Sequence, residues 1–177
     1  SCGNSVKLAK KIAKSLKAKY SPLSISAFPD GDITLQYNTK IKGKVVVIVN
    51  SFQPYSDLAL FRCVFAAQTA KQLGAKKVIL VAPYLAYMRQ DKMFEYGQSI
   101  TSRVMASMIN ISVDKIITID PHLHRYKSLK DIFTVTDKKL TANKLIGEYI
   151  KKKIKNPVII GPDGESYQWA EDVAKIA

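Results

Sequence analysis

Four short, mostly apolar runs that alternate with helical patterns constrain the fold of this chain most. The runs cover residues 45–49, 78–82, 116–119 and 158–160 and lack a strict polar alternation. Strands of this kind are typical of parallel sheets that are covered on both faces. Apolar residues recur at helical spacing over 6–19, 56–73, 99–109 and 141–154, and from about Glu165 onward. This rhythm predicts an α/β fold with a parallel sheet flanked by helices.

The outer parts of the chain suggest a piece of a longer protein. The helical pattern at 6–19 has no strand before it, and the last pattern is still running at Ala177. A sheet cut at these points would expose apolar surface. We therefore expect residues 1–177 to form one domain of a longer chain. Within it, residues 28–37 alternate like a half-exposed strand or a hairpin.

Composition bounds the class of protein and its partners. No apolar run approaches the roughly 18 residues that span a bilayer. Cys2 and Cys63 do not make a disulfide framework, so we expect a cytoplasmic protein without a membrane partner. The formal charge of +14 favours an anionic ligand, but many lysines fall on polar helix faces. Phosphorylated small molecules therefore remain candidate ligands, and nucleic acid is the less favoured partner.

The segment at 83–92 is unusually polar for the end of a buried strand. It reads Pro-Tyr-Leu-Ala-Tyr-Met-Arg-Gln-Asp-Lys and directly follows the run at 78–82. In open parallel sheets, ligands bind beyond the carboxyl ends of the strands. Arg89 offers planar donors that suit phosphate oxygens, and Gln90 can reach the edge of a base. The segment is a candidate ligand site, although a solvated loop over packed tyrosines fits the same residues.

The chain's two histidines lie together after the run at 116–119. The segment reads Asp120-Pro-His122-Leu-His124, and in extended backbone residues two apart can point the same way. A carboxylate beside a neutral imidazole can hold a divalent cation, and a histidine can serve as an acid or base. The alternative is a strand end at which one histidine bonds to the backbone.

Two turns complete the candidate chemistry. At 28–32, Phe-Pro-Asp-Gly-Asp sets an aromatic face beside two carboxylates, which suits a nucleoside but is also an ordinary hairpin turn. At 161–165, Gly-Pro-Asp-Gly-Glu precedes a helix, so Asp163 and Glu165 can hold Mg²⁺ with phosphate oxygens. Simple capping of that helix by Asp163 is the alternative. Neither a Gly-x-Gly-x-x-Gly nor a P-loop sequence is present.

Taken in order along the chain, these segments resemble those of the ribose-phosphate pyrophosphokinases, or PRPP synthases. Residues 28–32 are similar to Phe-x-Asp-Gly-Glu, and 83–92 to Pro-Tyr-x-x-Tyr-x-Arg-Gln-Asp-Arg/Lys. Residues 120–122 are similar to Asp-Leu-His, and 161–163 to Ser-Pro-Asp. The resemblance implies a type I phosphoribosyltransferase-like fold. It also implies Mg²⁺-dependent transfer of pyrophosphate from ATP to ribose 5-phosphate, giving PRPP and AMP for nucleotide biosynthesis.

The resemblance also implies roles for individual residues. It implies catalytic roles for His122 and Arg89, and a Mg²⁺ site at His122, Asp163 and Asp120. It implies that adenine stacks on Phe28. The full set of residues implied to contact ATP is Phe28, Asp30, Gly31, Asp32, Arg89 and Gln90. It further implies a homo-oligomer of dimers that form a hexamer, with ATP near a subunit interface.

Some residues depart from the family's pattern. Asp32 stands where Glu is typical, Gly164-Glu165 replaces a Gly-Gly pair, and His124 is an addition. No Asp-Asp-x-x-x-Thr-Gly-Gly sequence, which binds the ribose phosphate in this family, is present. We therefore expect the chain to carry the ATP/Mg²⁺ half-site and to be inactive alone.

Two alternatives to an enzyme stay open. A non-catalytic regulatory subunit associated with PRPP synthase would be expected to lose ATP-site residues, whereas Arg89, Gln90, His122 and Asp163 are retained. A basic nucleic-acid-binding domain would bind oligonucleotides with a steep dependence on salt concentration.

Overall fold

A computed structural model describes residues 1–177 as two compact units, Ser1–Lys139 and Leu140–Ala177. The first unit is built on a four-stranded sheet with the order β3-β4-β5-β6. The strands are β3 (Val45–Val49), β4 (Lys77–Ala82), β5 (Lys115–Ile119) and β6 (Thr136–Leu140). Strand β4 runs parallel to β3 and to β5. The predicted runs at 45–49, 78–82 and 116–119 are therefore confirmed as strands.

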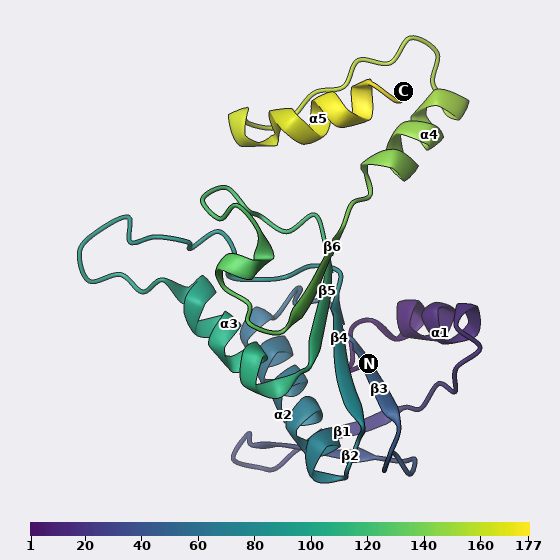
Figure 1. Cartoon of the computed structure of the whole chain (residues 1–177), viewed down its shortest axis with the longest axis vertical. Coiled ribbons are helices and arrows are strands. Elements are labelled where there is room, and N and C mark those ends of the chain that lie inside the picture. The colour runs from purple at the N-terminus through teal and green to yellow at the C-terminus, as the bar shows by residue number, and fades with distance from the viewer. The chain divides into compact units, whose positions relative to one another are not determined.

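Helices cover both faces of this sheet. Helices α2 (Ser56–Gln72) and α3 (Thr101–Ser112) lie on one face, and α1 (Val6–Ser15) lies on the other (Figure 1). The short helix η1 (Leu129–Asp131) precedes β6. The predicted α/β fold with a parallel sheet flanked by helices is confirmed. None of the helices has the length and apolar character that crossing a membrane would require.

The core lies between the sheet and α2. Small side chains on α2, Ala66, Ala67 and Ala70, are completely buried and let the helix approach the strands closely. Cys63 is also buried on this helix, as predicted. The pKa of the Cys63 thiol is raised, first by a hydrogen bond with Cys2 and then by burial. Both thiols therefore belong to the packed interior.

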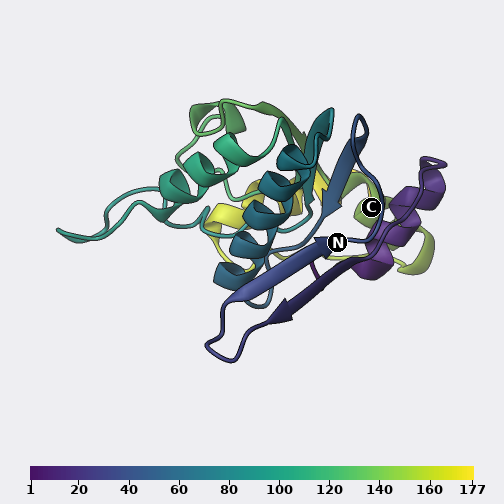
Figure 2. The same cartoon turned by 90° about the horizontal axis from the view of Figure 1, so that it is seen from below.

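A separate hairpin packs against α2. Strands β1 (Leu23–Ala27) and β2 (Ile33–Tyr37) pair antiparallel, and the Tyr37 hydroxyl donates to the Ala66 carbonyl at 2.9 Å (Figure 2). The hairpin alternative predicted for 28–37 is therefore correct. Its first strand lies earlier than predicted, because residues 28–32 form the turn. Gly31 adopts a φ of +94° there, and Asp30 Oδ1 accepts from the Asp32 N–H at 3.1 Å.

The second unit contains α4 (Asn143–Lys153), η2 (Gly164–Ser166) and α5 (Tyr167–Ala174). The two α-helices pack closely where Gly147 lies, since a Cβ there would come within 2.7 Å of the Ile176 side chain. The predicted strand at 158–160 is wrong. These residues pair with no strand, and Val158 is 82% exposed. Their apolar character was real, but a strand also requires a neighbour to receive its hydrogen bonds.

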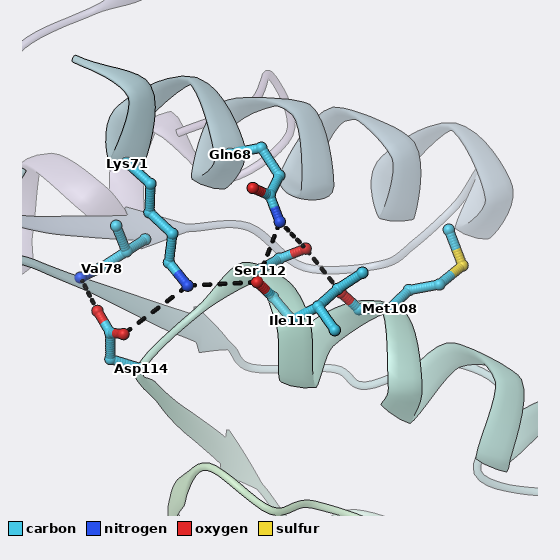
Figure 3. Close-up of polar contacts among 7 residues, drawn as sticks. All are labelled: Gln68, Lys71, Val78, Met108, Ile111, Ser112 and Asp114. Atoms are coloured by element: carbon cyan, nitrogen blue, oxygen red, sulfur yellow. Dashed lines mark hydrogen bonds and ion pairs between the residues drawn. The ribbon is translucent and has the colours of Figure 1, made fainter. Parts of the chain in front are cut away.

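A polar network joins α2 to the end of α3 (Figure 3). Gln68 Nε2 and Lys71 Nζ donate to the Ile111 carbonyl at 3.0 and 3.3 Å. Such contacts satisfy a carbonyl that the last turn of a helix leaves without a partner. Asp114 extends the network, because its Oδ2 accepts from the Val78 N–H at 2.7 Å and its Oδ1 lies 3.8 Å from Lys71 Nζ.

Replacement of Asp114 by alanine is expected to lower the free energy of unfolding by about 1–3 kcal/mol. The reason is that the backbone N–H of Val78, a completely buried residue, loses its acceptor. Lys71→Ala removes a partly exposed ion pair and one of two donors to the Ile111 carbonyl, which Gln68 still bonds, and is expected to cost about 0–1 kcal/mol. Urea unfolding of both variants measures the difference. Equal losses would show that the Asp114–Val78 hydrogen bond contributes nothing beyond the ion pair.

Candidate functional site

The segment after β4 combines buried apolar residues, which anchor it to the core, with polar side chains nearer the solvent. Leu85, Ala86 and Met88 are buried in the core, while Arg89 is exposed and Gln90 is partly buried between them and solvent. The apolar positions fix the path of the backbone, so the two polar side chains are held at the carboxyl end of β4. This is the end of a parallel strand at which ligands bind.

Arg89 and Gln90 line one open pocket of about 400 Å³. Its lining consists of Tyr87, Arg89, Gln90, Phe94, Gln98 and Thr101. Thr101 is the first residue of α3, so Arg89 shares the pocket with the N-terminus of this helix. The Thr101 hydroxyl is buried without a hydrogen-bond partner, and Phe94 is 55% exposed. The pocket thus combines cationic, donor and aromatic groups, which suit an anionic ligand with a flat ring.

Tyr87 holds this loop in an unusual conformation. Its φ is +65°, a left-handed value that is rare for a bulky residue and costs on the order of 1–3 kcal/mol. Its hydroxyl donates to Asp57 Oδ1 in the first turn of α2. Burial and this hydrogen bond raise the pKa of Tyr87 to about 12, so the hydroxyl stays protonated and remains a donor. The hydrogen bond to Asp57 thus anchors the loop at Tyr87, two residues before Arg89.

The loop after β5 carries the two histidines. The rings of His122 and His124 lie side by side with centroids 6.0 Å apart and planes tilted by 39°. Asp120 at the start of this loop also has a left-handed φ, +41°. Two neighbouring strands therefore end in loops that each contain a non-glycine residue with a positive φ. Such outliers are frequent at ligand sites.

The remaining predicted residues lie elsewhere. Residues 28–32 form the exposed tip of the hairpin and do not line the Arg89 pocket. In both overall views the tip lies well away from the loop that follows residue 92 (Figures 1 and 2). Asp163 belongs to the second unit, where its Oδ1 accepts from the Ser166 N–H at 2.9 Å and caps η2. The capping alternative is thus present in the structure.

The Asp and His side chains of the candidate site fit a metal ion only if a ligand such as a phosphate supplies further donors. No three His, Cys, Asp or Glu side chains of the chain form a cluster that could hold a metal ion alone. Mg²⁺ is usually bound by one or two carboxylates together with waters and substrate phosphates. Asp120 supplies a carboxylate and His122 an imidazole within one loop, so these donors fit a metal that arrives with a phosphate ligand.

A second hollow, of about 320 Å³, lies between α1 and β3. Its walls are largely aliphatic, with Ile12 and Leu16 on the helix side and the valines of β3 opposite. It contains none of the predicted site residues. We therefore place the candidate chemistry in the pocket at the end of β4.

Comparison with known proteins decides the family. Residues 1–112 match the model of the N-terminal domain of ribose phosphate pyrophosphokinase, which is more than half of the chain. The chain belongs to this family. The resemblance inferred from the ordered segments is therefore confirmed.

Curated relatives named ribose-phosphate pyrophosphokinase agree with this assignment. The chain is 34% identical over 173 residues to that of Methanopyrus kandleri, covering 97% of the chain and 58% of the relative. It is 33% identical over 171 residues to that of Methanobrevibacter smithii, covering 96% of the chain and 56% of the relative. The chain thus spans little more than half the length of these relatives.

A solved structure agrees on the fold. Phosphoribosylpyrophosphate synthetase from Mycobacterium smegmatis superposes with a TM-score of 0.84 at 23% sequence identity. The match covers 96% of this chain and 57% of that structure. It shows that the arrangement of strands and helices is that of the synthetase.

Three residues of the pocket were not among the predicted ones. Phe94, Gln98 and Thr101 line it together with Arg89 and Gln90. Phe94 lies beside Met93 in the loop before α3, and exposed large apolar side chains in a loop are a signal of a contact surface. Gln98 and Thr101 carried no such signal, because only the return of the loop toward α3 brings them to the pocket.

Proposed function

We propose that the chain carries the ATP- and Mg²⁺-binding half of a ribose-phosphate pyrophosphokinase. The complete enzyme transfers pyrophosphate from ATP to the 1-hydroxyl of ribose 5-phosphate, with AMP as the leaving group, in nucleotide biosynthesis. The observation that carries the proposal is the shared pocket of Arg89 and Gln90 at the carboxyl end of β4. Membership of the family supports it.

The residues of the pocket fit distinct tasks in this reaction. Arg89 lies beside the N-terminus of α3, and both favour phosphate oxygens over a neutral ligand. Gln90 can bond to the edge of the adenine ring. His122, in the loop after the adjacent strand, can orient a phosphate or bind the metal. When bound, Mg²⁺ would neutralise charge on the transferred group, with Asp120 and His122 as the proposed protein donors of the first unit.

The turn at 28–32 fits this proposal best as part of a second subunit's site. Phe28 is 56% exposed, and Asp30, Gly31 and Asp32 are exposed beside it. Because the turn does not line its own chain's pocket, we propose that it stacks on the adenine bound by a partner in a homo-oligomer. The dimers that form a hexamer, implied by the resemblance, would supply this arrangement. A cytoplasmic location without membrane or nucleic-acid partners goes with this function.

Binding of Mg²⁺-ATP tests the half-site directly. A ligand at 100 times its dissociation constant stabilises a protein by about 2.7 kcal/mol, so the unfolding midpoint of the chain should rise by several degrees. Mg²⁺-GTP serves as the control for base recognition. Stabilisation by an oligonucleotide that disappears steeply with salt, and none by Mg²⁺-ATP, would favour the nucleic-acid-binding alternative.

The reaction itself requires the full-length protein. With ribose 5-phosphate and Mg²⁺-ATP, we expect release of AMP in amounts equal to the PRPP formed. A full-length protein that binds Mg²⁺-ATP yet releases no AMP would instead be the non-catalytic regulatory subunit.

A further inference from the structure

The loops after β4 and β5 are joined by an ion pair between a buried carboxylate and a partly exposed guanidinium, which the proposed chemistry does not use. Asp91 follows Gln90 in the first loop, and its side chain is completely buried. Its Oδ1 accepts from Arg125 Nη1 at 2.8 Å, and its Oδ2 has no hydrogen-bond partner. A buried carboxylate depends strongly on its counter-ion, because desolvation without pairing is costly. Arg125 therefore holds the end of the Arg89–Gln90 segment in place.

A second link runs beside the first. The Ser102 hydroxyl donates to the Gln90 carbonyl at 2.9 Å, and so accepts from the Tyr126 hydroxyl at 2.8 Å. Ser102 and Tyr126 are both buried. Consecutive residues after β5, Arg125 and Tyr126, thus fix consecutive residues after β4, Gln90 and Asp91. Two adjacent restraints remove the freedom of the backbone that one hydrogen bond would leave.

The outer side of Arg125 reaches the pocket lining. Its guanidinium lies 5.4 Å from the centre of the Phe94 ring, and Lys92 Nζ lies 5.1 Å from the same ring. Phe94 lines the pocket with Arg89 and Gln90. The planar guanidinium can pair with a carboxylate while it lies against an aromatic ring, which an ammonium does less well. One side chain therefore contacts both the buried Asp91, next to Gln90, and the pocket residue Phe94.

We propose that Arg125, assisted by Tyr126, is a positioning residue that holds residues 88–94 in the geometry needed to bind the nucleotide. This inference rests on the proposed function only for the identity of the ligand. The ion pair also ties the loop of Arg89 and Gln90 to the loop of His122, so the phosphate-binding and metal-binding groups keep a fixed separation. Neither Arg125 nor Tyr126 needs to touch the nucleotide.

Hydrogen exchange in the full-length protein tests the positioning without any ligand. Arg125→Gln is expected to raise amide exchange across residues 88–94 at least tenfold, while exchange in β4 and β5 stays unchanged. Asp91→Asn should raise it similarly, and the two changes combined should be far from additive, because both break one interaction. Lys130→Ala, an exposed change nearby, is the control. Unchanged exchange at 88–94 in Arg125→Gln would overturn the inference.

Binding of Mg²⁺-ATP to the same full-length variants gives the second readout. Arg125→Gln is expected to raise the dissociation constant about tenfold, whereas Lys130→Ala leaves it unchanged. Faster exchange with an unchanged dissociation constant would make the ion pair merely structural and overturn the positioning role. If the wild type itself binds no Mg²⁺-ATP, the proposed function fails, and the exchange data still decide whether Arg125 holds the loop.

A milder variant covers the case in which Arg125→Gln does not fold. Tyr126→Phe removes one hydroxyl and keeps the ring in place. It is expected to raise exchange at residues 88–94 by a smaller factor, about threefold, and to weaken Mg²⁺-ATP binding in proportion. A folded Tyr126→Phe protein with wild-type exchange and affinity would also overturn the inference.

Discussion

Replacing Arg89 with alanine is expected to lower kcat/KM of the full-length enzyme for ATP by about 100- to 1000-fold. Arg89 is the exposed cation of the pocket and lies beside the N-terminus of α3, where charge on the phosphates would build up. Its loss removes a charge-assisted donor that water replaces poorly. AMP release at several ATP concentrations measures the effect.

The form of the loss shows what Arg89 does. A fall in kcat would mean that Arg89 acts mainly on the transition state, whereas a rise in KM alone would mean uniform binding of ATP. Arg89→Lys keeps the charge without the planar fork and should recover part of the rate. Arg103→Ala removes an exposed arginine from α3 that does not line the pocket, and so serves as the matched control. Equal effects of Arg89→Ala and Arg103→Ala would refute the site.

Replacing Phe52 with alanine is expected to cost about 3–5 kcal/mol of unfolding free energy. Phe52 is completely buried directly beyond β3, and its N–H donates to the Tyr84 carbonyl at 3.1 Å. The cavity would therefore open beneath the start of the 83–92 segment. Because a native domain is stable by only about 5–15 kcal/mol, the variant is expected to be close to unfolding at 37 °C.

Phe65→Ala is the matched control for this change. Phe65 is 42% exposed on α2 and contacts Phe61 edge to face, with ring centroids 6.1 Å apart. Its truncation leaves no enclosed cavity and should cost about 1 kcal/mol. Chemical unfolding of both variants gives the comparison. A Phe52→Ala protein as stable as Phe65→Ala would mean that the core beneath the 83–92 segment refills the space.

The sequence predicted three strands of the sheet because each is a mostly apolar run of four or five residues that alternates with helical patterns along the chain. The run at 158–160 is apolar like the other three, but an apolar pattern does not show whether a partner strand is present. Strand β6 went unpredicted for the opposite reason. It reads Thr-Asp-Lys-Lys-Leu and lies at the edge of the sheet, where charged residues are common.

The part of the candidate site that comes from a single segment of the sequence was predictable. Arg89 and Gln90 lie in the segment that follows the end of β4, so their place near a ligand site could be expected from the chain alone. The Asp91–Arg125 ion pair joins residues 34 apart, and no spacing rule connects them. Thr101 reaches the pocket only because the loop before it folds back. Such contacts depend on the tertiary structure.

Under the proposed function, the exposed turn at 28–32 would link catalysis to protein concentration. A site with Arg89 from one subunit and Phe28 from another exists only in the associated state, because neither chain places both groups around one pocket. Specific activity would then fall on dilution, in step with the dissociation of the subunits. Phe28→Ala and Arg89→Ala chains that are each weakly active alone would regain activity when mixed. Some of the sites formed would then combine the intact Phe28 of one chain with the intact Arg89 of the other.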